Sequence, residues 1–191
     1  MTAAESIIEQ LREKFPTTAF RAVVSCGDQT LYVPGDTLFE VLAYLKTDAA
    51  LRFDYLVDIT AVDYRESGRP LEVVYQLRSL PHGWDLRVKT ELDKSGELSV
   101  KSVWDLWRGS DWMEREVFDM FGVRFLGHPD LRRILMWETY AEGYPLRKDF
   151  PLRGRFTRAE QTRQALGMAP EAHYSTEEIS LAGVNPAADE S

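Results

Sequence analysis

Residues 53–92 constrain the fold most, because they hold three segments of β type in close succession. Alternate residues are apolar over residues 53–64, and residues 71–77 and 84–92 continue the β pattern. The links between these segments are too short for a helical crossover, so neighbouring strands must run at least partly antiparallel. The buried face of the first strand is predicted to comprise Phe53, Tyr55, Val57, Ile59 and Ala61.

Helical patterns precede this β-rich stretch. Thr2 and Glu5 form a capping-box pattern at the start of a predicted helix over residues 3–14, and an apolar stripe predicts a second helix over residues 37–47. Between them, residues 20–33 predict a β-hairpin. We predict an α+β fold: a two-layer domain with a mixed, largely antiparallel sheet of about five strands packed by helices, plus an extended C-terminal segment.

Two further helices are predicted after the sheet, near residues 101–107 and 112–121. Asp111 and Glu114 have the spacing of a cap for the second of these helices. Gly122 can end that helix in the left-handed conformation. The second helix therefore has a defined start and end in the sequence.

The character of the chain changes after Phe150. Residues 152–167 are weakly helical, and residues 169–191 are poor in large apolar side chains. Such a segment cannot bury enough surface to fold alone. We therefore predict one α+β domain over residues 1–150 and an extended, partner-wrapping tail over residues 151–191.

The formal charge of -8 comes from 31 acidic and 23 basic side chains and opposes nucleic acid as the default partner. The charge is unevenly distributed, because residues 122–163 hold nine basic and five acidic groups between two acidic stretches. A basic stretch between acidic flanks is a candidate docking surface. Charge counting alone favours the alternative, a solvated arginine-rich loop with internal carboxylate partners.

Sequence patterns for catalysis and for cofactor binding are absent. The single cysteine, Cys26, excludes an intramolecular disulfide and any iron–sulfur cluster held by this chain alone, and it suits a reducing compartment. His82, His128 and His173 lack the spacing of a metal site, and no glycine-rich phosphate loop occurs. We expect no cofactor and no metal to be bound by this chain.

No apolar run in the sequence is long enough for a membrane helix.

Residues 111–152 are the most informative stretch of the sequence. Arg115 and Asp119 stand four apart on the predicted helix and can pair, and Arg132 and Arg133 follow within a short turn that returns them toward the helix. One interpretation is an internal lattice of carboxylates and guanidinium groups that pins a long loop to the domain. The other is that some of these charges point outward to a neighbouring subunit. Charge chemistry alone favours the internal lattice.

Four sequence blocks resemble the signature of one family. One block lies in the β-rich region and three lie within residues 111–152. The blocks are residues 58–64 (DITAVDY), 114–122 (EREVFDMFG), 127–136 (GHPDLRRILM) and 145–151 (PLRKDFP). In this order they are similar to the C subunit, the 30-kilodalton subunit, of the proton-pumping NADH:quinone oxidoreductase, respiratory complex I. The sequence departs from the family pattern at Tyr144, where many relatives carry histidine.

The resemblance implies a non-catalytic structural subunit in the quinone-reducing module of the peripheral arm. In that family FMN, iron–sulfur clusters and quinone are bound by partner subunits. The implied partners are the large subunit that forms most of the quinone cavity and the small subunit that carries the terminal cluster, on the cytoplasmic side of the bacterial inner membrane. The expected interface or motif residues are Asp58, Asp63, Glu114, Arg115, Glu116, Asp119, His128, Asp130, Arg132, Arg133, Arg147, Lys148 and Asp149.

Two alternatives stay open on the sequence. The chain could be the equivalent subunit of a related membrane-bound hydrogenase or of a ferredoxin-dependent complex, because other subunits choose the electron donor. A more distant alternative is a small stand-alone enzyme that uses a carboxylate pair such as Glu116 and Asp119.

Overall fold

The computed structural model of the chain describes residues 3–64, 68–152 and 155–168, with side chains from Ile7 onward. Its backbone contacts divide the chain into two units, residues 1–154 and 155–191. The predicted cap at Thr2 and the predicted extended course of residues 169–191 lie outside the described residues. Each unit is described below by itself.

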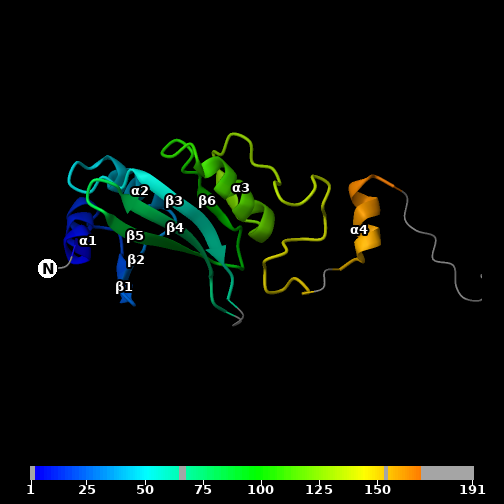
Figure 1. Ribbon diagram of the computed structural model, residues 1–191. Helices are drawn as coiled ribbons and strands as arrows, with labels where there is room; N and C mark the ends of the chain where they lie inside the picture. Colours follow the sequence, from blue (N-terminus) through cyan, green and yellow to red (C-terminus); the bar gives the residue numbers. More distant parts are fainter. Residues whose placement is uncertain (1–2, 65–67, 153–154, 169–191) are drawn as a thin grey trace, which may run out of the picture. The chain divides into compact units, whose positions relative to one another are not determined.

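A five-stranded mixed sheet forms the centre of the first unit (Figure 1). Its order is β1-β2-β5-β4-β3, and all neighbours are antiparallel except β2 and β5, which run parallel. This confirms the predicted mixed, largely antiparallel sheet and the predicted hairpin. The strands are β1 (Arg21–Ser25), β2 (Asp28–Tyr32), β3 (Tyr55–Val62), β4 (Leu71–Ser79) and β5 (Trp84–Leu92).

Three helices of this unit contribute to one core with the sheet: α1 (Ala3–Lys14), α2 (Leu38–Thr47) and α3 (Ser110–Phe121). On β4, Tyr75 and Leu77 are fully buried in this core, whereas Gln76 and Arg78 lie on the opposite, open face. The two helices predicted over residues 3–14 and 37–47 are confirmed. No helix within the described residues is long and apolar enough to span a membrane.

The predicted helix near residues 101–107 is wrong. A short strand, β6 (Ser99–Lys101), pairs there in parallel with β7 (Arg124–Leu126), and turns follow up to α3. Val100 is 3% exposed between two less buried neighbours, so this segment buries alternate residues as a strand does. Pairing with a strand distant in sequence therefore replaced the expected start of the helix at Lys101, and the residues after it form turns.

For α3, the predicted cap at the start of the helix is wrong, whereas the predicted end at Gly122 is confirmed. The helix begins after Gly109 without a side-chain cap, and the Glu114 carboxylate turns away to bind other residues. Gly122 ends the helix with φ +74°, in the left-handed region where a residue with a side chain is strained.

A β-bulge changes the predicted buried face of β3. The register with β4 shifts between Leu56 and Asp58, so that Val57 is an extra residue. Leu56 consequently joins the core, whereas Tyr55 is 50% exposed. Tyr55 and Val57 are therefore the two wrong members of the predicted face, and Phe53, Ile59 and Ala61 are buried as predicted.

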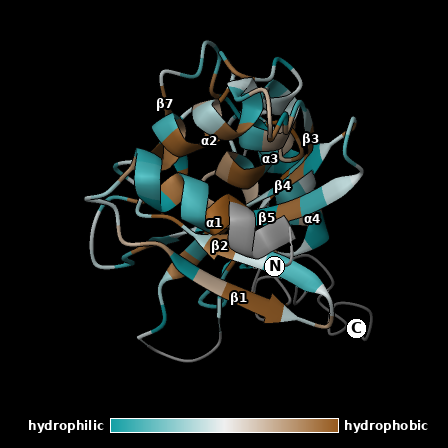
Figure 2. Ribbon diagram, turned by 90° about the vertical axis from the view of Figure 1, so that its left-hand side faces the viewer, coloured by the Kyte–Doolittle hydropathy of each residue, from teal (hydrophilic) through white to brown (hydrophobic). Residues whose placement is uncertain are grey.

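The other edge strand, β1, carries exposed valines and is coloured hydrophobic in Figure 2. Cys26 lies in the turn that follows this strand, has φ +53° and is exposed. Gly27 beside it has φ +88°, so both turn residues have the positive φ that a tight two-residue hairpin requires.

Within the second unit, residues 155–168 contain the helix α4 (Arg158–Ala165). A complete capping box between Thr157 and Glu160 starts it. The helix buries none of its residues. This agrees with the weak helical pattern predicted over residues 152–167.

Candidate functional site

Residues 127–150, called the strap below, follow β7 and contain no helix or strand. Charged groups of α3 hold the strap through a series of hydrogen bonds to its backbone and side chains. The strap holds most of the residues that the sequence singled out, so it is the candidate site.

Asp119 is the centre of this arrangement, and its side chain is fully buried. Its Oδ1 atom accepts a hydrogen bond from Nη1 of Arg133 at 2.6 Å. Its Oδ2 atom accepts from three consecutive backbone N–H groups, those of Ile134 at 3.0 Å, Leu135 at 2.7 Å and Met136 at 2.8 Å. Burial by itself raises the pKa of Asp119, but these donors outweigh it and hold the pKa below the usual value. One carboxylate thereby fixes four residues of the strap.

The two arginines that accompany Asp119 bind backbone carbonyls. Arg133 also donates to the carbonyl oxygens of Asp119 at 3.1 Å and Gly143 at 3.3 Å. Arg115 donates from Nε to the carbonyl of Arg132 at 3.2 Å and from Nη2 to that of Arg133 at 3.0 Å. The predicted pairing of Arg115 with Asp119 along the helix is therefore wrong, because each side chain finds its partner on the strap.

The C-terminal part of the strap is fixed to α3 and to the end of β3. Arg147 donates from Nε to the carbonyl oxygen of Phe121 at 2.5 Å. The backbone N–H of Lys148 donates to Oδ2 of Asp63 at 2.8 Å, and Lys94 forms an ion pair with the same carboxylate. Burial opposes ionisation of Asp63, but the bonds from Lys148 and Lys94 leave its pKa below the usual value.

The ring of Tyr144 occupies the space beside Gly122. A Cβ atom on Gly122 would lie 2.4 Å from this ring, closer than such atoms approach one another in proteins. The guanidinium carbon atoms of Arg147 and Arg133 lie 4.6 and 5.4 Å from the ring centre. Tyr144 therefore packs where α3 ends.

A buried polar cluster fixes the start of the strap. Glu114 is fully buried and accepts hydrogen bonds from the Ser102 hydroxyl at 2.6 Å and from the Val103 N–H at 2.7 Å. Burial raises the pKa of Glu114 to about 7 in spite of these donors. The side chain of His128 is likewise fully buried, and its Nε2 atom lies 3.9 Å from Glu114 and 3.2 Å from Oδ1 of Asp111.

The tautomer of His128 follows from its other nitrogen. Nδ1 accepts a hydrogen bond from the Asp130 N–H at 3.1 Å, so it carries no proton in that arrangement. The proton of the neutral ring is then on Nε2, which faces the two carboxylates. His128 thus links the turn at the start of the strap to α3.

The structure divides the predicted site residues into two groups. The inward group is buried or half-buried and makes the contacts above: Asp63, Glu114, Arg115, Asp119, His128, Arg133 and Arg147. The outward group has exposed side chains: Asp58, Glu116, Asp130, Arg132, Lys148 and Asp149. Arg132 and Asp130 pair with each other at 2.8 Å while both stay about 60% exposed. Asp58 lies on β3, and none of its contacts joins it to the strap.

Sequence reasoning missed several partners of the inward group. Ser102 and Lys94 lie outside residues 111–152, and a sequence does not show that the backbone carbonyl of Gly143 accepts a hydrogen bond. Aromatic residues at 140 and 144 near Arg133 were the one available signal, since guanidinium groups favour aromatic neighbours. The inward group therefore pins the strap to the domain, but it does so mainly through backbone N–H and C=O groups and not through a lattice of carboxylates and guanidinium groups.

The strap and α3 also carry exposed apolar side chains. Trp112 is 62% exposed on α3, and its ring centre lies 5.3 Å from the guanidinium carbon of Arg115. Leu135 and Leu146 are 61% and 50% exposed, and their backbone N–H groups bind Asp119 and Met120. The outer side of the strap thus combines charged and apolar groups, as protein interfaces do.

The carboxylate pair considered for a stand-alone enzyme does not act as a pair. Glu116 is exposed, whereas Asp119 is fully buried and bound by four donors. The described residues include no group of three or more histidine, cysteine or acidic side chains that could hold a metal ion.

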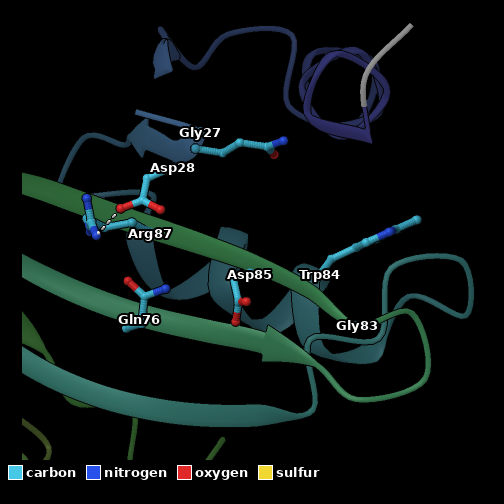
Figure 3. A pocket seen from close by; sticks show the side chains of 8 residues that line it. Gly27, Asp28, Gln76, Gly83, Trp84, Asp85 and Arg87 are labelled. Atoms are coloured by element: carbon cyan, nitrogen blue, oxygen red, sulfur yellow. Dashed lines mark hydrogen bonds and ion pairs between the residues drawn. The ribbon is translucent and has the colours of Figure 1, made fainter. Parts of the chain in front are cut away.

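A polar hollow of about 280 Å³ opens where β2 and β5 begin (Figure 3). The ion pair between Arg87 and Asp28, at 3.0 Å, lies on its wall. None of the residues singled out in the sequence lines this hollow.

Comparison with known proteins relates the chain to components of respiratory enzymes. Residues 31–156 match the family described as respiratory-chain NADH dehydrogenase, 30 Kd subunit. The C 2 subunit of NADH-quinone oxidoreductase from Rhizobium etli is 44% identical over 75% of this chain and 75% of its own length. The C subunit of NADH-quinone oxidoreductase from Citrifermentans bemidjiense is 41% identical over 77% of this chain and 89% of its own length.

A solved structure has the same fold. One chain of the membrane-bound sulfane sulfur reductase, an archaeal respiratory membrane complex, superimposes with a TM-score of 0.57 at 24% identity. The match covers 90% of this chain and 95% of that chain.

Proposed function

Since the chain belongs to the family of the 30 kDa subunit of respiratory-chain NADH dehydrogenase, we propose that it is a structural subunit of an NADH:quinone oxidoreductase. In this role the chain is a peripheral component of the quinone-reducing module. The assembled enzyme transfers electrons from NADH to quinone and couples this transfer to proton translocation. FMN, iron–sulfur clusters and quinone are bound by the partner subunits.

We further propose that the chain docks on the large subunit of the quinone cavity and on the small subunit with the terminal cluster. These partners hold it on the cytoplasmic side of the bacterial inner membrane. Its contribution to the reaction is geometric, because the donors and acceptors of electrons must be held in fixed positions.

The observation that supports this proposal best is the division of the charged residues on the strap. Asp119, Arg133 and Arg115 bind the backbone of the strap and fix its course. The side chains of Arg132 and Leu135 consequently point outward from a backbone that cannot easily move. A preorganised surface loses less conformational entropy on docking than a free loop would.

The charge reversal Arg132→Glu tests the proposal. We expect a several-fold decrease in the amount of assembled complex in solubilised membranes, measured by native electrophoresis, because repulsion replaces a steering charge. The complexes that do form should keep their NADH:quinone reductase activity per molecule. Arg108→Glu is the matched control, since Arg108 is 64% exposed on another part of the chain.

Normal amounts of complex that lack quinone reductase activity would contradict the proposal. That result would point to direct participation of Arg132 in the chemistry. The inward group gives no comparable test of docking, because its replacement disturbs the strap itself.

A further inference from the structure

The bulge of β3 brings an aromatic ring and a carboxylate to the same face of the sheet. Tyr55 lies opposite Arg78 of β4, and Asp58 lies opposite Gln76, so both side chains are on the open face. Residues three apart on a regular strand would point to opposite faces. The extra residue Val57 removes this alternation, which is the effect by which bulges re-aim side chains.

These residues form a patch at the border of the sheet. Tyr55 is 50% exposed, Val57 is 39% exposed and Asp58 is exposed. Leu80 follows β4, is 62% exposed and donates its backbone N–H to Asp54, the residue before β3. We call Tyr55, Val57, Asp58 and Leu80 the edge patch.

The carboxylate of the edge patch differs from the other acidic groups on the open face. Within the residues that the structure describes, Asp58 forms no ion pair and no side-chain hydrogen bond. Its neighbours on that face are neutralised in pairs: Glu91 with Arg21 at 2.6 Å, Glu72 with Lys89 at 2.8 Å, Asp28 with Arg87 at 3.0 Å and Asp85 with Arg78 at 3.8 Å.

The backbone of β3 adds a second recognition element. In the described chain β3 pairs with β4 alone, so every second residue directs its N–H and C=O groups away from the sheet. An extended peptide satisfies donors and acceptors at this spacing, and such strand addition is a recurring mode of recognition. A charge on an edge strand can also serve only to repel other strands. An edge built only to repel would not expose Tyr55 and Val57 beside the charge.

We propose that the edge patch is a second docking surface, separate from the strap, for an extended segment of another subunit. That segment carries a lysine or arginine opposite Asp58 and an apolar side chain against Tyr55 and Leu80. The proposal rests on the proposed function only in that another subunit must be present. It assigns a role to Asp58, an outward residue that lies on β3 and not on the strap.

Photo-crosslinking in the assembled complex tests the proposal. A benzoyl-phenylalanine at position 55 should form an adduct with one other subunit, and the crosslinked peptide should contain a lysine or arginine. The matched control is the same substitution at Val24, which is 67% exposed on the opposite edge strand. We expect Asp58→Lys to lower the adduct yield about tenfold and Asp58→Asn to lower it less, because the amide keeps a hydrogen-bonding group.

Two results would overturn the edge patch as a docking surface. One is the absence of an adduct at position 55 in complexes that assemble normally, and the other is an adduct with a second copy of this chain. Failure of the proposed function has a different signature, in which the unsubstituted chain is missing from purified complexes. The Asp58→Asn variant keeps the test decisive if Asp58→Lys does not fold.

Discussion

The inward and outward groups of charged residues alternate along the same short sequence blocks, yet they have different surroundings. Arg132 is about 60% exposed and pairs with an equally exposed Asp130, whereas Arg133 is 14% exposed and binds a fully buried Asp119. Neighbours in sequence therefore have separate roles, one in fixing the strap and one in presenting charge at its surface. The comparison predicts that stability depends on the inward group and docking on the outward group.

The largest effect on stability is expected from Asp119→Asn. This change removes the charge of a buried pair and leaves Arg133 without its anion, which should cost about 3–5 kcal/mol of unfolding free energy. Urea unfolding of the purified chain measures the loss. Glu116→Gln, an exposed carboxylate on the same helix, is the control and should change the unfolding free energy by less than about 0.5 kcal/mol. Equal losses in both variants would remove the distinction between the groups.

Gly122→Ala should have the next largest effect. Strain at φ +74° and the overlap of the new Cβ with Tyr144 together predict a loss of about 2–4 kcal/mol. Gly127→Ala is a matched control, because Gly127 has φ +87° but no atom within 4 Å of the added Cβ. The control should lose about 1–2 kcal/mol, from strain alone. A loss at residue 122 no larger than at residue 127 would show that the ring of Tyr144 moves aside easily.

The pKa of Glu114 predicts a pH dependence between about pH 5 and 8. Because burial raises this pKa from 4.5 to about 7, the folded chain holds the proton more tightly than the unfolded chain. The resulting stabilisation, about 3 kcal/mol, is complete below pH 4.5 and is lost as the pH rises through 7. The lowered pKa values of Asp63 and Asp119 have the opposite effect on stability. Their contribution is present above pH 3.8 and is lost as the pH falls below that value.

Unfolding free energies measured at several pH values test this dependence. Glu114→Gln should flatten the curve between pH 5 and 8, whereas Glu116→Gln should leave its slope unchanged. An unchanged slope in Glu114→Gln would assign the titration to another group.

Arg132→Ala should have the smallest effect on stability, less than about 0.5 kcal/mol, because exposed ion pairs contribute little. The same variant should still weaken assembly, since exposed charges steer association. A calorimetric scan of the chain and quantification of the complex in membranes separate the two effects. A large loss of thermal stability in this variant would show that Arg132 stabilises the fold, as residues of the inward group do.

Sequence patterns predicted the elements whose cause is local. The stripe of α2 and the alternation in β5 follow from side-chain periodicity, and Gly122 ends α3 as its backbone freedom allows. The failures involve partners distant in sequence. Residues 99–101 pair with β7 where a helix was predicted to begin, and the bulge at Val57 depends on the register with β4.

The candidate site was predictable as a set of residues but not as a set of contacts. Spacing suggested a bond between Arg115 and Asp119 along the helix, because residues four apart are neighbours there. Carbonyl and N–H groups of the strap compete for the same side chains, and a sequence does not mark backbone partners. The division into inward and outward groups therefore required coordinates.

The contacts of Asp119 and Asp63 also differ in the length of chain that they close, which bears on how the strap folds. Asp119 binds residues 14 to 17 positions away, whereas Asp63 binds a residue 85 positions away. Short loops lose less entropy on closure and form sooner than long ones. The strap should therefore fold against α3 first. The hydrogen bond between Lys148 and Asp63 should form later, when the strap and α3 pack together on the sheet.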